Sequence, residues 1–141
     1  ALLTTDQTNL RHKMVDHYGI ENLAQLIPGT SYCSRHASIE RGSIVQRGVT
    51  GHIRREHRYS CKIDLGTTIH HDCRVGMYLV LAPGSRLLGK VSIGQRVFIG
   101  ASPVVHPGCS VDDDAITGAG ALVNRDVGSS TTVVGAPACP L

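Results

Sequence analysis

The sequence has almost none of the bulky aromatic residues on which an ordinary globular core depends. It contains no tryptophan and one phenylalanine, whereas 16 of its 141 residues are glycine. A chain of this length supports one domain core, which must then be built from isoleucine, valine and leucine. That composition favours many short strands joined by tight turns.

Paired cysteines and long apolar runs are also missing. The five cysteines are odd in number and contain no CxxC spacing. This pattern argues against a disulfide framework and a zinc knuckle, and it favours a reducing compartment. Because neither a signal peptide nor a long apolar run is visible, we expect a cytoplasmic protein with no membrane partner.

The net charge is small. At +3, and without a lysine-rich run or a stripe of interleaved aromatic and basic residues, the chain is not expected to bind nucleic acid. Seven of the fourteen basic residues lie between Arg35 and Lys62. They predict a positive surface, which is either a solvated face or a place for the phosphate of a nucleotide or coenzyme.

Residues 1–26 are expected to form a short helix and a linker. The helix would run from Asp6 to Tyr18, with Asp6 or Thr8 as its cap and Gly19 at its end. The next segment, Ile20 to Leu26, would be a helical turn or linker. One face of the helix is expected to carry the apolar residues spaced four apart, Leu10, Met14 and Tyr18.

From residue 27 onward, hydrophobic residues recur every six positions. Counted from Ile27, thirteen of nineteen such positions are Ile, Leu or Val, and all nine from Ile63 to Val111 are filled. The residue two positions earlier is mostly small. A triangular solenoid requires this alternation of a long inward side chain and a small corner residue, whereas a hairpin sheet would repeat every two residues.

Three hexads make a coil of eighteen residues. Residues 27–141 are therefore expected to form an all-β solenoid, a left-handed parallel β-helix of about six coils, which is an exception to the right-handed crossover rule. The repeat is damaged from Val49 to Ser60, where Gly51 and His57 take inward positions and Arg55 takes a corner. We expect a distorted coil there, with the register resuming at Ile63.

Candidate chemistry lies in the stretch Gly66 to Gly76, where two adjacent histidines precede Asp72. Residues eighteen apart stack in one column, which puts Gly89 one rung from His71. In that geometry His71 could take a proton from an attacking amine or hydroxyl, while the Gly89 N–H stabilises the oxyanion. Asp72 could orient the imidazole only if the backbone turns a corner between the two residues.

Several motifs together resemble one acyltransferase family. They are Thr67-Thr-Ile-His-His-Asp-Cys-Arg-Val-Gly76, Leu81-Ala-Pro-Gly84, Val91-Ser-Ile-Gly94, Val97-Phe-Ile-Gly100, Gly118-Ala-Gly-Ala-Leu-Val123, Arg125-Asp-Val127 and Val133-Val-Gly-Ala-Pro-Ala138. From about Ile27 to Ala138 the chain is similar to the C-terminal half of the sialic acid O-acetyltransferase and UDP-4-amino-sugar N-acetyltransferase family.

The resemblance implies acetyl transfer from acetyl-CoA to an amine or hydroxyl of a sugar or nucleotide sugar. It implies direct attack without an acyl-enzyme, no metal, and a homotrimer with its sites between neighbouring solenoids. It places the base on His71, the acidic partner on Asp72 and the oxyanion donor on Gly89. The coenzyme would contact Ala101 and Ala119 through its pantetheine arm, and its adenine end would lie near Gly135, Ala136 and Pro137.

The chain departs from the family pattern in four places. His70 stands where a glutamate is common, Val80 replaces a second active-site histidine, and Cys139 replaces a basic residue. Residues 1–26 resemble only the last helix and linker of the family's nucleotide-sugar-binding domain, of which they would be a remnant. These differences leave open the acceptor and the choice between N- and O-acetylation.

Two other functions compete with acetyl transfer. His52 and His57 have the spacing of two zinc ligands in γ-class carbonic anhydrases, and His36 or His71 could complete a three-histidine site. The basic residues around them disfavour a cation. The damaged coil also allows a noncatalytic trimeric scaffold.

Overall fold

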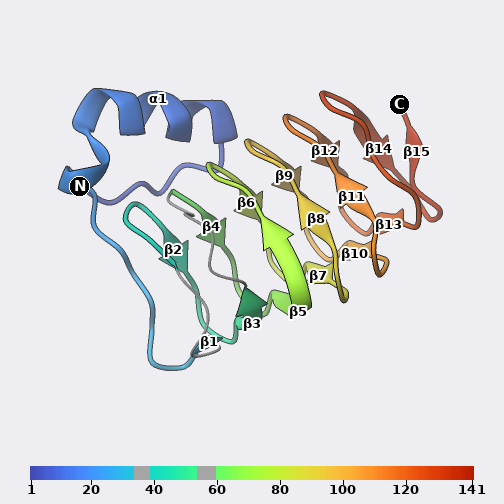
Figure 1. Ribbon diagram of the computed structural model, residues 1–141, viewed down its shortest axis with the longest axis horizontal. Helices are drawn as coiled ribbons and strands as arrows, with labels where there is room; N and C mark the ends of the chain where they lie inside the picture. Colours follow the sequence, from blue (N-terminus) through green and yellow to red (C-terminus); the bar gives the residue numbers. More distant parts are fainter. Residues whose placement is uncertain (34–38, 54–59) are drawn as a thin grey trace.

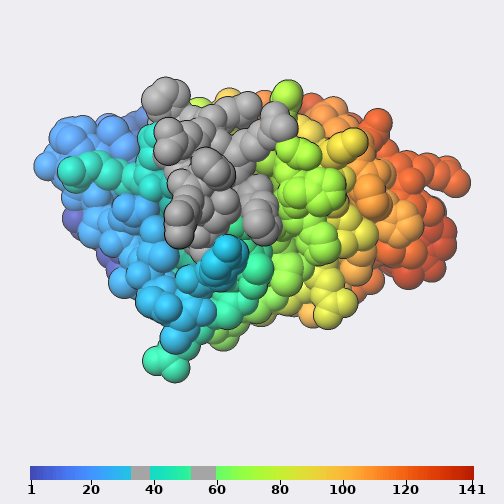
Figure 2. Space-filling view, turned by 60° about the horizontal axis from the view of Figure 1, so that its bottom comes forward, coloured from blue at the N-terminus to red at the C-terminus, as the bar shows by residue number. Residues whose placement is uncertain are grey.

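The chain winds into a parallel β-solenoid of about five turns, with one helix at its N-terminal end (Figure 1). The computed structural model describes residues 1–33, 39–53 and 60–141, except for the side chains of Cys33, His52 and Ile53. The coils follow one another in chain order along the length of the molecule (Figure 2). The hexad count predicts about six coils, but the last segment turns back and pairs antiparallel instead of winding on.

The strands lie on three faces. On the first face are β2 (Ile44–Val45), β4 (Lys62–Ile63), β6 (Val80–Leu81), β9 (Phe98–Ile99), β12 (Ile116–Thr117), β14 (Thr132–Val134) and β15 (Cys139–Pro140). On the second are β1 (Tyr32–Cys33), β3 (Thr50–Ile53), β5 (Thr68–Val75), β7 (Arg86–Leu87), β10 (Val104–Val105) and β13 (Leu122–Val123). The end of β5 continues onto the third face, with β8 (Ser92–Ile93) and β11 (Ser110–Val111).

The predicted period is confirmed by the strand register. Ile69 pairs with Leu87, and Val75 pairs with Ile93, in each case eighteen residues later. The inward positions from Ile63 to Val123 are all buried, so the core consists of the aliphatic side chains that the composition predicted. Small polar residues that precede them are buried at the corners, including Ser43, Thr67 and Ser85.

The period fails in the last coil. Val111 is bridged to Val127, sixteen residues later, because the chain takes a shorter corner there. Val127 and Val133 are therefore the buried residues, whereas the six-residue period places Ser129 and Gly135 inward. The loss of two residues keeps valines in the core, since a serine and a glycine would bury little apolar surface.

The first coils follow the prediction only in part. Ile27, expected to point inward, is 43% exposed. Gly51 is buried, and the register between β3 and β5 shifts after it, as expected for a distorted coil. Arg55 and His57 lie outside the described residues. The register has resumed by Lys62, which pairs with Val80.

The helix α1 (Thr8–Tyr18) is followed by the 3₁₀ turn η1 (Ile20–Asn22), and Gly19 ends the helix at φ 73° as predicted. The predicted cap is wrong: Gln7 is the N-cap and makes no side-chain capping bond. Of the three apolar residues expected on one face, Met14 is partly buried against the N-terminal core, whereas Leu10 and Tyr18 are exposed. The fully buried residues of the helix are Arg11 and Val15. No helix of the described chain is both long enough and apolar enough to cross a bilayer.

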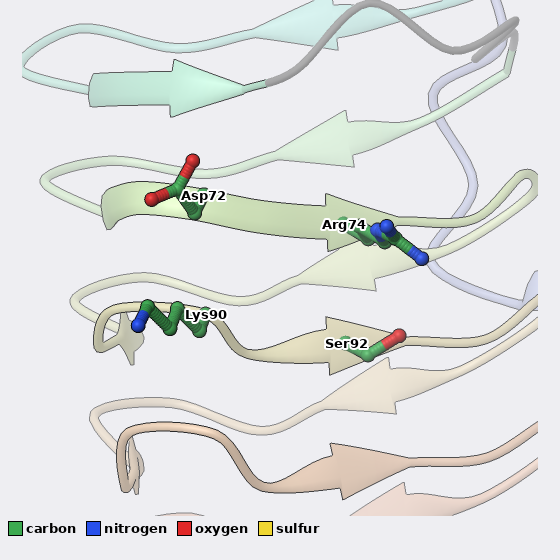
Figure 3. A pocket seen from close by; sticks show the side chains of 4 residues that line it. All are labelled: Asp72, Arg74, Lys90 and Ser92. Atoms are coloured by element: carbon green, nitrogen blue, oxygen red, sulfur yellow. The ribbon is translucent and has the colours of Figure 1, made fainter.

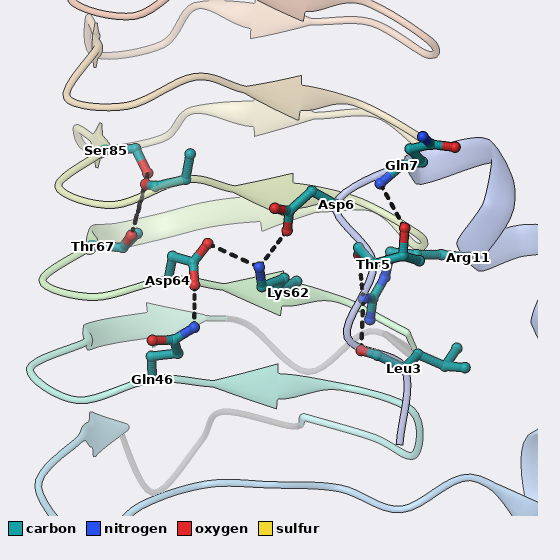
Figure 4. A network of polar contacts seen from close by, with 11 residues as sticks. Leu3, Thr5, Asp6, Gln7, Arg11, Gln46, Lys62, Asp64, Thr67 and Ser85 are labelled. Carbon is teal, nitrogen blue, oxygen red and sulfur yellow. Dashed lines mark hydrogen bonds and ion pairs between the residues drawn. The ribbon is translucent and has the colours of Figure 1, made fainter. Parts of the chain in front are cut away.

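Arg11 fastens the N-terminal segment to the solenoid, and Figure 4 shows its place beside Leu3 and Thr5. Its side chain is fully buried, and its Nη1 donates to the carbonyls of Leu3 and Thr5 at 3.0 and 3.1 Å. Its Nε and Nη2 donate at 3.0 Å to the carbonyls of Ser60 and Gly42, which belong to the coils. Burial lowers the pKa of Arg11 from its ordinary value. One guanidinium therefore joins three separate segments of backbone.

A second polar contact explains why Asp6 does not cap the helix. Asp6 pairs with Lys62 of β4, and Lys62 also lies 3.4 Å from Asp64 (Figure 4). Burial lowers the pKa of Lys62, but its contacts with the two carboxylates outweigh burial and raise the pKa overall. Asp6, which was expected to cap the helix, therefore binds the solenoid instead.

Candidate active site

The site is built at the corner between the second and third faces, which β5 crosses. Asp72, Lys90 and Gly108 occupy this corner in three successive coils, and their φ angles are 61°, 63° and 75°. This left-handed conformation is costly for most residues, but it turns the chain within one step. The backbone therefore changes direction between His71 and Asp72.

That change of direction brings the two side chains together. Nδ1 of His71 lies 3.2 Å from Oδ2 of Asp72, which meets the condition set from the sequence for their contact. The imidazole is 68% exposed and the carboxylate 40% exposed. The N–H of Lys90 donates to the carbonyl of His71 at 2.9 Å, so the backbone of the histidine is held by the next coil. Asp72 can orient the imidazole while Nε2 is left for other chemistry.

Gly89 lies against the other side of the imidazole. A Cβ placed on Gly89 would be 2.7 Å from Nε2 of His71, closer than any ordinary contact. The column predicted from the eighteen-residue coil is therefore confirmed, and the absence of a side chain at Gly89 is what admits the ring. Within the described chain, no hydrogen-bond acceptor is paired with the N–H of Gly89.

Two hollows flank the corner. The first has a volume of about 380 Å³ and lies on the second face; it is lined by Thr50, Thr68, Ile69, His70 and His71. The other has a volume of about 370 Å³ and lies toward the third face; it is lined by Asp72, Arg74, Lys90 and Ser92 (Figure 3). His71 and Asp72 thus lie between the two hollows.

Sequence reasoning missed three residues of the second hollow, Arg74, Lys90 and Ser92. A signal was available, since the rule that paired His71 with Gly89 also pairs Asp72 with Lys90 and Arg74 with Ser92. The last of these pairs is a ladder pair between β5 and β8.

The residues expected to contact the coenzyme lie at a different corner. Ala101 and Ala119 follow β9 and β12 at the junction of the first and second faces, and the N–H of Gly120 donates to the carbonyl of Ala101 at 2.8 Å. Continuing the sixteen-residue register of the last coil, Gly135 follows Ala119 in the same column. All three are exposed, as are Ala136 and Pro137. Within one chain, this column and the His71 corner lie on opposite edges of the second face.

Two further residues that the sequence analysis considered, Cys73 and Val80, are buried. Cys73 is fully buried, and its Sγ donates to the carbonyl of Leu88 at 3.0 Å. Burial raises the pKa of this thiol, which disfavours the thiolate that a nucleophile needs. Val80, which stands where the family has a second histidine, is buried in β6 on the first face.

The three-histidine zinc hypothesis rests on residues that the structure describes only in part. The side chain of His52, and all of His36 and His57, lie outside the described residues. In the parts that are described, no group of three His, Cys, Asp or Glu side chains could hold a metal ion.

No protein-family model matches the chain. An acyl-[acyl-carrier-protein]--UDP-N-acetylglucosamine O-acyltransferase of Alkalilimnicola ehrlichii is 36% identical over 72 residues, which are 51% of this chain and 28% of that relative. The chain therefore matches only about a quarter of the length of this curated relative.

Solved structures match over almost the whole chain. PerB of Caulobacter crescentus, in complex with CoA and GDP-perosamine, has a TM-score of 0.90 and 30% identity over 99% of this chain and 69% of its own. A histidine-to-asparagine mutant of this perosamine N-acetyltransferase, with the same two ligands, has a TM-score of 0.93, 29% identity, and 99% and 68% coverage. The acetyltransferase domain of PglB from Neisseria gonorrhoeae, with acetyl coenzyme A, has a TM-score of 0.91 and 24% identity over 99% and 69%.

These matches confirm the left-handed β-helix. The match to PerB combines sequence identity with coverage of more than two thirds of that chain. The chain belongs to the hexapeptide-repeat family of acyltransferases, in which its structural neighbours are sugar N-acetyltransferases.

Proposed function

We propose that the protein transfers an acetyl group from acetyl-CoA to an amine or hydroxyl of a sugar or nucleotide sugar. The observation that carries this proposal is the position of His71, whose Nδ1 faces Asp72 while Nε2 lies against the backbone of Gly89. A base beside a backbone donor is what acyl transfer requires. The complexes of PerB with CoA and GDP-perosamine support the two substrate classes.

In the proposed mechanism, His71 takes the proton of the acceptor amine or hydroxyl as that group attacks the thioester carbonyl. Asp72 holds the imidazole by Nδ1 and stabilises it when it becomes protonated. The N–H of Gly89 donates to the carbonyl oxygen as negative charge develops there. The C–S bond then breaks, and the protonated His71 returns its proton to the departing sulfur, so that the coenzyme leaves as a thiol and His71 is neutral again. The histidine mutant of the perosamine enzyme supports the importance of a histidine in this family.

We further propose that the active unit is a homotrimer in the cytoplasm. The predicted base and the predicted coenzyme column, Ala101, Ala119 and Gly135, stand on opposite edges of one face, so a compact site requires a neighbouring copy to supply one of the two. Exposed small residues in a column leave room for an extended pantetheine arm. Among the described residues, Cys73, Cys109 and Cys139 form no disulfide bond, which suits a reducing compartment.

The activity can be tested by measuring CoA thiol release from acetyl-CoA with a panel of acceptors. The panel contains UDP- and GDP-linked 4-amino sugars, the free amino sugars and sialic acid. We expect acceptor-dependent release with at least one member, and a trimer in sedimentation equilibrium. If the protein binds acetyl-CoA but releases no CoA thiol with any acceptor, the result would favour a noncatalytic scaffold. A monomer would remove the site between subunits.

The Gly89→Ala variant is expected to keep its fold but lose activity. The added methyl group would meet the ring of His71, which is exposed enough to move away. Since misplacement of a catalytic group by about 1 Å can cost about 10²-fold, we expect kcat to fall by about 10- to 100-fold. Gly128→Ala is the matched control, because its methyl group would meet nothing closer than 3.8 Å. Equal kcat values for the two variants would contradict the close packing of Gly89 on the base.

A further inference from the structure

We infer that Cys73 is a positioning residue, whose buried thiol fixes the direction of the backbone N–H of Gly89. This inference rests on the proposed function and deepens it, because that N–H is the proposed donor to the oxyanion. Cys73 acts through a neighbouring peptide group rather than on the substrate. Its Sγ donates to the carbonyl of Leu88 at 3.0 Å, and this carbonyl belongs to the same peptide group as the N–H of Gly89.

The geometry of the peptide group connects the thiol to the N–H. A peptide group is planar, and in its trans form the C=O and the N–H point in opposite directions. In the described chain the one cis peptide bond lies between Ala136 and Pro137, so the bond between Leu88 and Gly89 is trans. The carbonyl of Leu88 points toward the buried thiol, and the N–H of Gly89 must therefore point away from it.

The corner at Leu88 lacks a hydrogen bond that the same corner has in the next coil. There the carbonyl of His106, eighteen residues after Leu88, accepts from the N–H of Cys109 at 3.3 Å and closes the turn. Within the described chain, no backbone N–H donates to the carbonyl of Leu88. The thiol of Cys73 thus takes the place of the turn hydrogen bond, and the direction of this carbonyl depends on it.

The thiol is kept in the form that can donate. Burial raises the pKa of Cys73, although backbone N–H groups, first among them that of Val91, oppose the rise. The fully buried side chain therefore stays a thiol, and only a thiol can donate to a carbonyl oxygen. The contact between Cys73 and Leu88 is thus a hydrogen bond of fixed direction.

The N–H of Gly89 is left for a ligand. Gly89 is buried, and in the part of the chain that the structure describes its N–H has no acceptor. A buried N–H without a partner costs free energy until a ligand or water accepts from it. The next peptide is fixed separately, because the carbonyl of Gly89 accepts from the N–H of Gly108 at 3.0 Å. The thiol thus holds the peptide whose N–H is still available to an oxyanion.

The test removes the donor in two ways and restores it in a third. Cys73→Ala deletes the thiol. Cys73→Val fills the space without a donor, as Val91 does at the same position of the next coil, where it is fully buried. Cys73→Ser keeps a donor. The matched control is Cys61→Ala, which deletes another buried thiol, one that donates to the carbonyl of Gly76 at 3.4 Å.

The expected kinetic effect is confined to kcat. Loss of a whole oxyanion donor costs about 10²- to 10³-fold in kcat, and a misdirected donor loses part of that, so we expect a fall of about tenfold in Cys73→Ala and Cys73→Val. The KM values of acetyl-CoA and the acceptor should stay within about twofold, because the oxyanion forms only in the transition state. Cys73→Ser and Cys61→Ala should keep kcat within about threefold of wild type.

A readout without activity separates this inference from the proposed function. In protein made with ¹⁵N-labelled glycine, the amide resonance of Gly89 is identified by its loss in Gly89→Ala. Its nitrogen shift responds to hydrogen bonding at the Leu88 carbonyl of the same peptide. We expect Cys73→Ala and Cys73→Val to move this resonance, Cys73→Ser to return it toward wild type, and Cys61→Ala to leave it in place, whether or not acetyl transfer is observed.

Three results would overturn the inference. The first is a Gly89 resonance that stays in place in both Cys73→Ala and Cys73→Val. The second, in active protein, is equal kcat for the serine, alanine and valine variants of Cys73. The third is an equal fall of kcat in Cys61→Ala, which would assign the loss to a weakened core.

Discussion

Replacing His71 with alanine is expected to lower kcat for acetyl transfer by about 10²- to 10⁴-fold, the contribution typical of a positioned general base. The substitution removes the ring that lies between Asp72 and Gly89, and no other described side chain is in place to accept the proton there. The ring is largely exposed and carries no core contact, so the fold should be unaffected. CoA thiol release under saturating substrates measures the effect.

The matched control is His70→Ala. His70 is the preceding residue, is also exposed and lines the hollow on the second face, but it does not face Asp72. Its removal should change kcat less than tenfold, while coenzyme A dissociation constants for both variants stay within about threefold of wild type. If the two alanine variants have equal turnover, His71 is not the base. If only His70→Ala is inactive, the roles of the two histidines are reversed.

Replacing Arg11 with methionine is expected to lower the free energy of unfolding by about 3–5 kcal/mol. The buried guanidinium donates to four backbone carbonyls, and within the described chain these carbonyls have no other hydrogen-bond donor. Each buried carbonyl left unpaired costs about 1–3 kcal/mol, although relaxation and water recover part of the sum. A loss of this size is a large fraction of the stability of a typical domain. Urea unfolding at fixed protein concentration measures it.

Lys13→Met is the control for the second prediction. Lys13 is a basic residue on the same helix but is exposed, so its replacement should change the unfolding free energy by less than about 0.5 kcal/mol. Arg11→Lys should fall between the two, since an ammonium keeps the charge but cannot reach all four carbonyls. An Arg11→Met protein within 1 kcal/mol of wild type would show that the helix is held by its apolar contacts instead.

The solenoid could be predicted from the sequence because its physical cause is periodic. Every third hexad returns to the same face, so a buried aliphatic residue at one position requires another eighteen residues later. The same spacing places Gly89 beside His71. The eighteen-residue spacing also predicts that Arg74 pairs with Ser92, although no sequence motif singles out these two residues.

The parts that could not be predicted depend on contacts between unlike segments. The buried residues of α1 could not be predicted because one of them is Arg11, a type that a hydrophobic pattern counts as exposed. The aspartate expected to cap the helix pairs with Lys62, which is fifty-six residues away. In the last coil a shorter corner shifts the register to Val127, and a fixed period cannot anticipate a deletion.

The column formed by Ala101, Ala119 and Gly135 is evenly spaced along the axis of the solenoid. Successive coils are separated by about 4.8 Å, so the distance along this edge grows by an equal amount with each coil toward the C-terminal end. Because each coil contacts only its neighbours, a whole coil could be inserted or removed without disturbing the others. With the coenzyme along this column, as we propose, the number of coils between the His71 corner and the end of the column would set the length of the donor that the solenoid binds.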